Sequence, residues 1–293
     1  MVNAVIPSDA RKVRVREIAA QDVEGVTDLL ARGFPRHRRD FWSNVLARLA
    51  KRPVLGTLPQ FGYLLENNGT AIGVILLIFS SNSGREDGAI RCNVSSWFVE
   101  PCFRSYASFL AAKALSHKDV TYLNLTPALH TRPIAEALGY REYASGTFVA
   151  VPSLHFDVCT TPVRLFDRSH SNGITPEERD LLLEHADYGC ISLMVETSSG
   201  PRPFVFRPRA IKGVRAFAEL IYCRDIEDFV RYAGSLGRFL LRRGKPLVIV
   251  ESNGPIAGLA GKYLAGRMPH FFKGPNRPRL GDLAYTELAM FDM

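Results

Sequence analysis

The sequence predicts a mixed α/β fold, in which a mostly antiparallel mixed sheet is flanked by helices. Its 293 residues are 46% hydrophobic and 23% charged, which is typical of a globular chain that buries a sizeable core. Short strand-like segments alternate with apolar residues at helical spacing. The same order of strands and helices also appears in both halves of the chain, which predicts an internal repeat. The length fits two domains or one large one.

The first half is predicted to begin with a strand at 13–18, where apolar and polar residues alternate. Helices follow at 23–30 and 39–49, each with apolar residues three and four positions apart. Asn67-Asn68-Gly69 is a turn signal, and it predicts a hairpin of strands 61–65 and 72–79. Pro101 ends the next strand, and Gly139 ends the last helix. The remaining elements are strand 90–99, helix 105–115, strand 120–125, helix 132–138 and strand 143–151.

The second half is predicted to repeat this order. After strand 163–166, Thr175-Pro176-Glu177-Glu178 is a helix start, with Thr175 as the N-cap and Glu178 closing a capping box. A turn at 198–200 joins the two strands of a second hairpin. The remaining elements are strands 191–196, 203–206 and 214–222, an amphipathic helix 226–243, a buried strand 247–250, a short helix 258–265 and a final strand 283–291.

The repeated order predicts two tandem domains, residues 1–152 and residues 153–293. Identity between the halves is low, so this prediction depends on element order and pattern. The alternative is a single irregular α/β domain.

Composition narrows the function classes. The net charge of +8 is compatible with an anionic ligand but too small to imply nucleic acid. Five widely spaced cysteines without C-x-x-C spacing favour a reducing compartment. The N-terminal residues have no apolar signal-peptide core, and no apolar run is long enough to span a bilayer, so we expect a cytoplasmic location.

Several enzyme classes lack their motifs. The seven histidines show no zinc-helix spacing, so no metal is expected. A serine nucleophile elbow and a P-loop are also missing from the sequence.

One segment resembles a known family. Val99-Glu-Pro-Cys-Phe-Arg-Ser-Tyr-Ala-Ser-Phe109 follows a predicted strand and opens a predicted helix. It is similar to the central motif V-x-P-x-[YF]-R-G-x-G-[IV]-G of the GCN5-related N-acetyltransferase (GNAT) superfamily, with matches at Val99, Pro101, Phe103 and Arg104. Gly139-Tyr140 is similar to the Gly-Phe that ends a later helix of the family. The resemblance covers about half of the chain, and the second half follows at the level of pattern.

The resemblance implies an acyltransferase that moves an acyl group from acetyl-CoA, or another acyl-CoA, to a small-molecule or peptide amine. In this family the N–H groups at the start of the motif helix face the pyrophosphate of coenzyme A, which suits an anion at a helix N-terminus. No membrane partner is expected. The cofactor-binding residues implied are Val99, Arg104, Ser105, Tyr106, Ala107, Ser108 and Phe109.

The sequence also departs from the family. Ser105, Ala107 and Phe109 stand where glycine is preferred, and the Phe109 ring must either crowd the phosphates or turn into the core. Ala135 occupies the place of a tyrosine that protonates the leaving thiolate, and 93–96 holds no carboxylate to act as base. The alternative function is therefore a non-catalytic member that binds a ligand or protein in the remnant cleft.

The second half offers substitutes for the catalytic groups. Glu219, on the strand that mirrors 90–99, is a candidate base; the alternative is an outward-facing side chain. Tyr263, three residues before Gly266, is a candidate acid, or else a core or surface tyrosine. Gly234 and Gly237 sit in an R-x-x-G-like stretch, and close helix packing is the alternative to phosphate binding.

Two basic segments add further candidates. Residues 35–52 carry six Arg or Lys residues against Asp40, which indicates either a patch for an acidic acceptor or the CoA 3′-phosphate, or a solvated helix face. Sparse aromatic residues there disfavour nucleic acid. Residues 273–279 are either an anion clamp or a basic surface turn.

Overall fold

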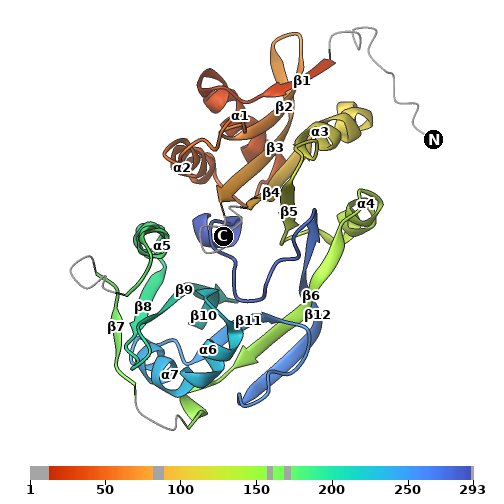
Figure 1. Cartoon of the computed structure of the whole chain (residues 1–293). Coiled ribbons are helices and arrows are strands. Elements are labelled where there is room, and N and C mark those ends of the chain that lie inside the picture. Colours follow the sequence, from red (N-terminus) through yellow and green to blue (C-terminus); the bar gives the residue numbers. More distant parts are fainter. Residues whose placement is uncertain (1–12, 82–88, 157–160, 168–172, 292–293) are drawn as a thin grey trace. The chain divides into compact units, whose positions relative to one another are not determined.

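The computed structural model describes residues 13–81, 89–156, 161–167 and 173–291. Its contacts divide the chain into two compact units, and the described residues of the first are 13–81 and 89–124. The second unit begins at Leu125 (Figure 1). The predicted domain boundary at residue 152 stays a prediction.

The first unit is a five-stranded mixed sheet in the order β1-β2-β3-β4-β5. Its first three neighbouring pairs are antiparallel, and β4 and β5 are parallel. The predicted elements are confirmed, with ends shifted by a few residues. They are β1 (Val13–Glu17), α1 (Val23–Gly33), α2 (Arg39–Ala50), β2 (Gly62–Asn67), β3 (Thr70–Ser81), β4 (Ile90–Val99), α3 (Ala107–Ala114) and β5 (Val120–Asn124), with 3₁₀ turns η2 (Ala20–Asp22) and η3 (Pro101–Tyr106).

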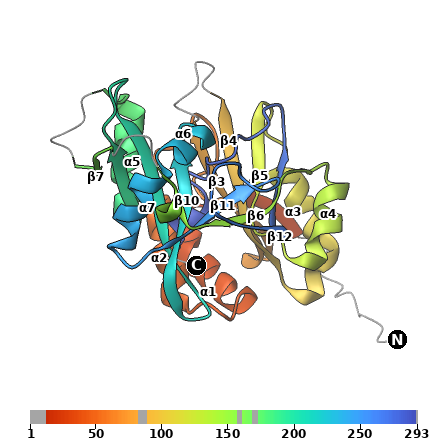
Figure 2. The ribbon, with the colours of Figure 1, turned by 90° about the horizontal axis from the view of Figure 1, so that it is seen from below.

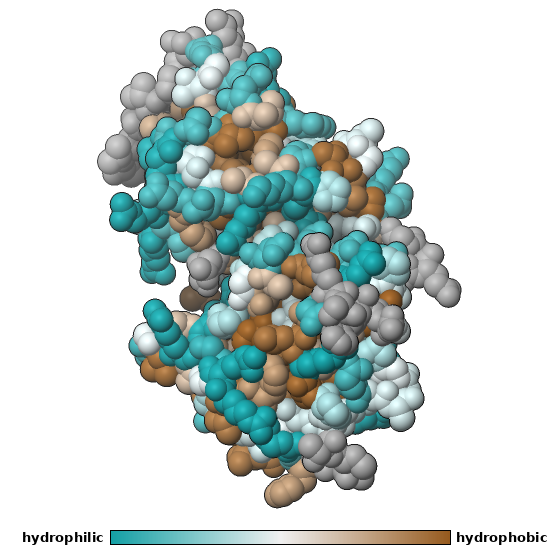
Figure 3. Space-filling model, turned by 90° about the vertical axis from the view of Figure 1, so that its left-hand side faces the viewer, coloured by the Kyte–Doolittle hydropathy of each residue, from teal (hydrophilic) through white to brown (hydrophobic). Residues whose placement is uncertain are grey.

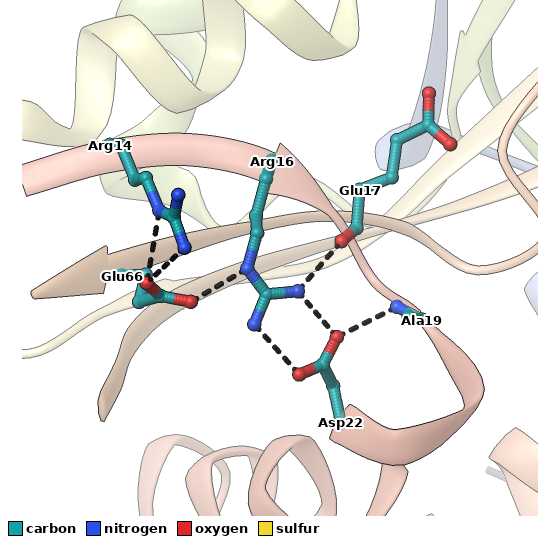
Figure 4. A network of polar contacts seen from close by, with 6 residues as sticks. All are labelled: Arg14, Arg16, Glu17, Ala19, Asp22 and Glu66. Carbon is teal, nitrogen blue, oxygen red and sulfur yellow. Dashed lines mark hydrogen bonds and ion pairs between the residues drawn. The ribbon is translucent and has the colours of Figure 1, made fainter. Parts of the chain in front are cut away.

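Both faces of this sheet are covered. Helix α1 packs on β3 and β4, and α3 packs on β2 and β3 (Figure 1). The apolar stripe of α1 is fully buried, as Leu29 and Leu30 show. A polar network ties β1 to its neighbours: Arg16 bonds Glu66 on β2 and Asp22 in η2, and Arg14 also bonds Glu66 (Figure 4).

The second unit is a seven-stranded mixed sheet in the order β12-β6-β11-β10-β9-β8-β7. Only β10 and β11 run parallel among its neighbouring pairs. Its elements are α4 (Arg132–Ala137), β6 (Arg141–Ala150), β7 (Val163–Leu165), α5 (Pro176–Asp187), β8 (Ile191–Val195), β9 (Arg202–Ile211), β10 (Val214–Cys223), α6 (Ile226–Arg231), α7 (Ala233–Leu241), β11 (Leu247–Ser252), β12 (Gly261–Lys273) and α8 (Glu287–Met290), with 3₁₀ turns η4 (Leu129–Thr131) and η5 (Pro152–Leu154).

Strand β6 lies between β11 and β12, so a first-half segment completes the sheet of the second half. Glycines permit the close approach of β6 and β12. A Cβ on Gly261 would lie 2.4 Å from the Val149 carbonyl oxygen. A Cβ on Gly146 would lie 2.5 Å from the Leu264 carbonyl oxygen.

The core of this unit fills the face of the sheet that α6 and α7 cover (Figure 2). Phe204, Phe206, Phe229 and Leu236 are completely buried there. On α5 the predicted capping box is confirmed, since Thr175 Oγ1 accepts from the Glu178 N–H and the Glu178 carboxylate accepts from the Thr175 N–H.

Two predicted elements are wrong. Residues 258–265 are not a helix, because 261–265 form the start of β12 and take their backbone bonds from β6. Residues 283–291 are not a strand, because the segment turns at Tyr285 (φ 56°) into α8. Both segments are short and have weak local preferences, so tertiary pairing decides their conformation.

The predicted helix 226–243 is broken at Tyr232 into α6 and α7. Close packing is confirmed at Gly237, where a Cβ would lie 2.2 Å from the Ser153 backbone nitrogen. Among the residues that the structure describes, no helix is both long and apolar enough to cross a membrane.

Candidate functional site

Strand β4 of the first unit opens away from its parallel neighbour. It pairs with β5 only from Ile90 to Asn93, although β4 continues to Val99. A bulge interrupts the pairing with β3 in the same stretch, where Leu76 faces Ser95 and Val74 faces Phe98. Ser96, at the bulge, has a left-handed φ of 49°. This half of β4 therefore presents a backbone edge that β5 does not pair.

The turn after β4 carries the motif residues that resemble the GNAT family. Arg104, Ser105 and Ser108 are exposed at its surface. The turn is the 3₁₀ helix η3, closed by bonds from the Phe103 N–H to Glu100 and from the Ala107 N–H to Arg104. A 3₁₀ turn uses its own N–H groups in i→i+3 bonds, so fewer of them face outward than at a glycine-rich helix start.

Phe109 does not turn into the core. Its side chain is 62% exposed and lies beside Tyr106, with ring centroids 6.2 Å apart. Val99 is buried at the end of β4, and its side chain packs over Gly73 of β3. The predicted cofactor-binding residues thus lie together around one turn, and their role stays a prediction.

The second unit repeats the opening between parallel strands. Strands β10 and β11 pair only across Phe217–Glu219 and Leu247–Ile249. The pairing of β10 with β9 shifts register between Leu220 and Tyr222, which places a bulge just beyond the parallel pairing, as in β4. A shortened parallel pairing next to a bulge is therefore present in both units.

In the second unit, however, the chain itself fills this opening. The Cys223 N–H donates to the Gly281 carbonyl at 2.9 Å, and the Leu283 N–H donates to the Ile221 carbonyl at 2.8 Å. Tyr222 and Asp282 form an antiparallel bridge. We call residues 279–283 the plug segment, because it occupies the edge of β10 that β11 leaves unpaired.

Side chains hold the plug segment on both sides. The Gly281 N–H donates to Glu251 Oε1 on β11 at 2.9 Å. Arg279 bonds the Cys223 carbonyl on β10, and its guanidinium lies 3.5 Å from Asp282. The predicted basic segment 273–279 therefore contributes one arginine to an internal contact.

The turn after β10 is acidic where the motif of the first half is basic. Asp225 caps α6, and Glu227 and Asp228 lie in its first turn. Asp228 is paired with Arg202 at 3.6 Å, and the carboxylates of Asp225 and Glu227 beside it disfavour a pyrophosphate, because like charges repel at short range. The second unit therefore lacks both the open strand edge and the favourable charge for a nucleotide donor.

Glu219 is not outward-facing, since it is only 4% exposed. Arg207 Nη2 donates to its Oε2 at 2.5 Å, and Arg209 Nη1 donates to its Oε1 at 2.8 Å. Both carboxylate oxygens thus bond a guanidinium. This arrangement suits a structural ion pair, because both oxygens of the carboxylate are already engaged by guanidinium groups.

Tyr263 lies on β12, and its hydroxyl is 2.8 Å from Ser145 Oγ. The structure does not bring Glu219 and Tyr263 together. Glu219 shares a row with Ile249, Val149 and Lys262 across the sheet. Tyr263, the residue after Lys262, therefore faces the opposite side of the sheet from Glu219. This placement on opposite faces argues against a shared base and acid pair, and the catalytic role of each side chain stays a prediction.

The other candidates have mixed outcomes. Glu100 is paired with Arg32 at 3.0 Å, and Ala135 is buried on α4. In the basic segment 35–52, Arg39 pairs with Glu24 and with Asp28, whereas Arg36 and Arg38 are exposed. Part of this positive charge is thus neutralised within the fold.

Sequence reasoning missed the bulges and the plug segment. The residue with the left-handed backbone at the β4 bulge is Ser96, which is neither glycine nor proline. Its residue type therefore gave no signal of a bulge. The plug segment carries a usable signal in Gly281, because its φ of 79° is one that glycine adopts readily, and a glycine at this place indicates a turn.

Comparison with known proteins shows similarity at the level of structure. No family model matches the sequence, and no curated protein matches it. A solved GCN5-related N-acetyltransferase from Kribbella flavida is 13% identical, with a TM-score of 0.55 over 90% of this chain and 72% of that one. A GCN5-related N-acetyltransferase from Anabaena variabilis is 12% identical, with a TM-score of 0.54 over 89% of this chain and 72% of that one.

A third structure is an assigned acetyltransferase from Pyrococcus horikoshii. It is 10% identical, with a TM-score of 0.57 over 94% of both chains. All three matches span most of the present chain, so they include both units. The chain therefore has the fold of the GCN5-related N-acetyltransferases, as the resemblance of its Val99–Phe109 segment predicts.

Proposed function

We propose that the protein is an acyltransferase that moves an acyl group, acetyl or longer, from an acyl-CoA to an amine acceptor. The observation that carries this proposal is the opening between β4 and β5, with its bulge at Ser96 and the motif turn beyond Val99. The unpaired edge of β4 offers backbone groups to an extended amide-bearing donor. Arg104, exposed on the following turn, offers a positive charge to its phosphates.

The first unit is the donor site in this proposal. The corresponding opening in the second unit holds the plug segment, and its following turn carries Asp225, Glu227 and Asp228. An acyl-CoA bound there would have to displace the plug segment and lie against three acids. We therefore expect one donor molecule per chain.

The thioester supplies an activated acyl group, and the chain needs mainly to position it and to accept a proton from the amine. Glu219 and Tyr263 are poor choices for proton transfer, because they face opposite sides of the sheet. Positioning by the β4 edge is thus the principal contribution that the described residues offer.

The test is isothermal titration of the full chain with acetyl-CoA and with a longer acyl-CoA at fixed low salt. Arg104→Ala is expected to weaken binding about tenfold or more, the usual effect of losing a charge-assisted bond to phosphate. Lys118→Ala, which removes an exposed charge from the same unit, is the matched control. Equal loss in both variants, or none in Arg104→Ala, contradicts a donor site at this turn.

The second candidate function is a non-catalytic GNAT-fold protein that binds a ligand or a protein. Two observations favour it: the 3₁₀ bonds that engage the motif turn, and Ala135 in place of an acid. Acyl transfer to a panel of amines separates the candidates. Saturable acyl-CoA binding without transfer to any amine supports the second candidate, and transfer rules it out.

A further inference from the structure

A cavity of about 660 Å³ lies in the second unit, between α6 and two segments that follow β11 and η5. Its volume is within the range of small-molecule sites, roughly 300–1,000 Å³. One wall is a stripe of α6, with Ile226 and Val230 one helical turn apart and Glu227 and Arg231 beside them. The opposite wall contains Phe156, Ile256 and Ala257. Most of the lining is therefore apolar, with a few polar groups.

The far wall is fixed by a hydrogen bond between its two segments. His155 Nδ1 lies 2.8 Å from the Gly258 carbonyl oxygen. Because a carbonyl oxygen only accepts, Nδ1 carries the hydrogen, and the imidazole ring has a set orientation. Phe156, the next residue, is 95% exposed, so a large apolar ring stands at the rim. Figure 3 shows one face of the molecule, on which brown apolar residues lie among teal hydrophilic ones. An exposed aromatic ring next to an apolar cavity favours an apolar occupant.

The charges on the α6 wall do not cancel each other. Among the residues that the structure describes, Arg231 has no carboxylate within ion-pair distance, and it lines the cavity. The Glu227 carboxyl instead shares a hydrogen bond with Asp225, which raises the pKa of Glu227 above its ordinary value. The Arg231 guanidinium is therefore a full charge of the cavity wall to which the described residues bring no carboxylate.

We propose that this cavity binds an apolar molecule that carries one carboxylate, such as a medium-chain fatty acid, with Arg231 as its counter-ion. The apolar walls take the hydrocarbon part, and the guanidinium at the exposed end of α6 takes the head group. This site is separate from the β4–β5 opening of the first unit, so it does not depend on the acyltransferase proposal.

The probe is decanoate, with decanol as its neutral counterpart, titrated calorimetrically into the full chain. We expect saturable decanoate binding that weakens about tenfold in Arg231→Gln, while decanol affinity is unchanged by that substitution. Arg242→Gln, an exposed arginine after α7, is the matched control and should bind both as the wild type does. Equal decanoate affinity in Arg231→Gln and wild type overturns the proposal, as does the absence of saturable binding.

A second variant tests the place of binding. Ala257→Trp fills the cavity from its exposed rim, and it should abolish decanoate binding while acyl-CoA binding stays at the wild-type level. Circular dichroism confirms that the variant is folded. Decanoate binding that survives in the folded variant places the ligand elsewhere and overturns the proposal. Simultaneous loss of acyl-CoA binding overturns it as well, because the cavity would then belong to the donor site.

Discussion

The backbone N–H of Gly281 donates a hydrogen bond to the carboxylate of Glu251, a residue of β11 that is 5% exposed. The other oxygen of that carboxylate lies 2.7 Å from His270 Nδ1 on β12. One buried side chain thus joins the plug segment to two strands that flank β6. The plug segment is therefore an integral part of the second unit, held by a hydrogen bond to a buried side chain.

Gly281→Ala tests how tightly the plug segment fits. An added Cβ would lie 2.7 Å from Cys223 Sγ at a φ of 79°, so both packing and backbone strain oppose it. Gly213→Ala is the control, because its φ is 82° but nothing lies within 4 Å. We expect the control to cost about 1 kcal/mol of unfolding free energy and Gly281→Ala about 1–3 kcal/mol more. Equal losses in urea unfolding would mean that the segment yields freely.

The plug segment also predicts the donor stoichiometry. Calorimetric titration should give one acyl-CoA per chain, since the plug segment occupies the edge of β10 that β11 leaves unpaired. Hydrogen exchange should show that acyl-CoA protects amides of β4 and leaves those of Ile221 and Cys223 unchanged. Two bound molecules, or protection at β10, would contradict the assignment of the donor site to the first unit.

Glu219→Gln tests the ion pair with Arg207 and Arg209. Glu219 and Arg207 side chains are only 5% and 7% exposed, so the variant leaves a buried guanidinium without its counter-charge. We expect a loss of about 3 kcal/mol or more in unfolding free energy. Glu196→Gln breaks the more exposed pair with Arg164 and should cost less than about 1 kcal/mol. A Glu219→Gln variant that is fully stable but inactive would instead restore Glu219 as a catalytic residue.

The network in Figure 4 predicts how stability depends on pH. Hydrogen bonds from Arg16 hold the pKa values of Asp22 and Glu66 below their ordinary values. A carboxylate with a lowered folded pKa stabilises the protein above its unfolded pKa, and this stabilisation disappears as pH falls through the folded pKa.

Arg16→Gln should therefore lower the unfolding free energy by about 1 kcal/mol at pH 7 and by progressively less below about pH 4. Urea unfolding at a series of pH values measures the difference between variant and wild type. A difference that stays constant from neutral to acidic pH would show that the network contributes through packing instead of charge.

Gly237→Ala tests the contact of α7 with η5. Its Cβ would lie 2.2 Å from the Ser153 backbone nitrogen, and backbone atoms cannot move aside cheaply. We expect a loss of about 2–3 kcal/mol in unfolding free energy. The control is Gly25→Ala on α1, where nothing lies within 4 Å and alanine favours the helix by up to about 1 kcal/mol. Similar stability of the two variants would contradict close packing at Gly237.

Local sequence patterns predicted most helices and strands, because the start and end of these elements depend on residues close in sequence. The capping box at Thr175 and the hairpin around Asn68 are set by side chains a few positions apart, and both are present. The strand at Gly261 was missed because its partner, β6, is distant in sequence. Its half-exposed, glycine-containing sequence has no alternation that indicates a strand.

The candidate site was predicted in part. The motif at Val99–Phe109 predicted the fold, and its role in binding stays a prediction; it did not reveal that η3 engages its own N–H groups. For Glu219 the sequence left two alternatives, a catalytic base and an outward-facing side chain. In the structure the side chain is buried and bonds Arg207 and Arg209. Such pairings across strands depend on register, which the single sequence does not specify.

The position of β6 has a consequence for synthesis on the ribosome. Strand β6 is made before β11 and β12, yet it ends with one on each side. Until both have emerged, its apolar residues and unpaired backbone are available to other nascent chains. Slower translation after β6 lengthens the time during which this strand lacks its partners, so we expect it to increase aggregation rather than relieve it.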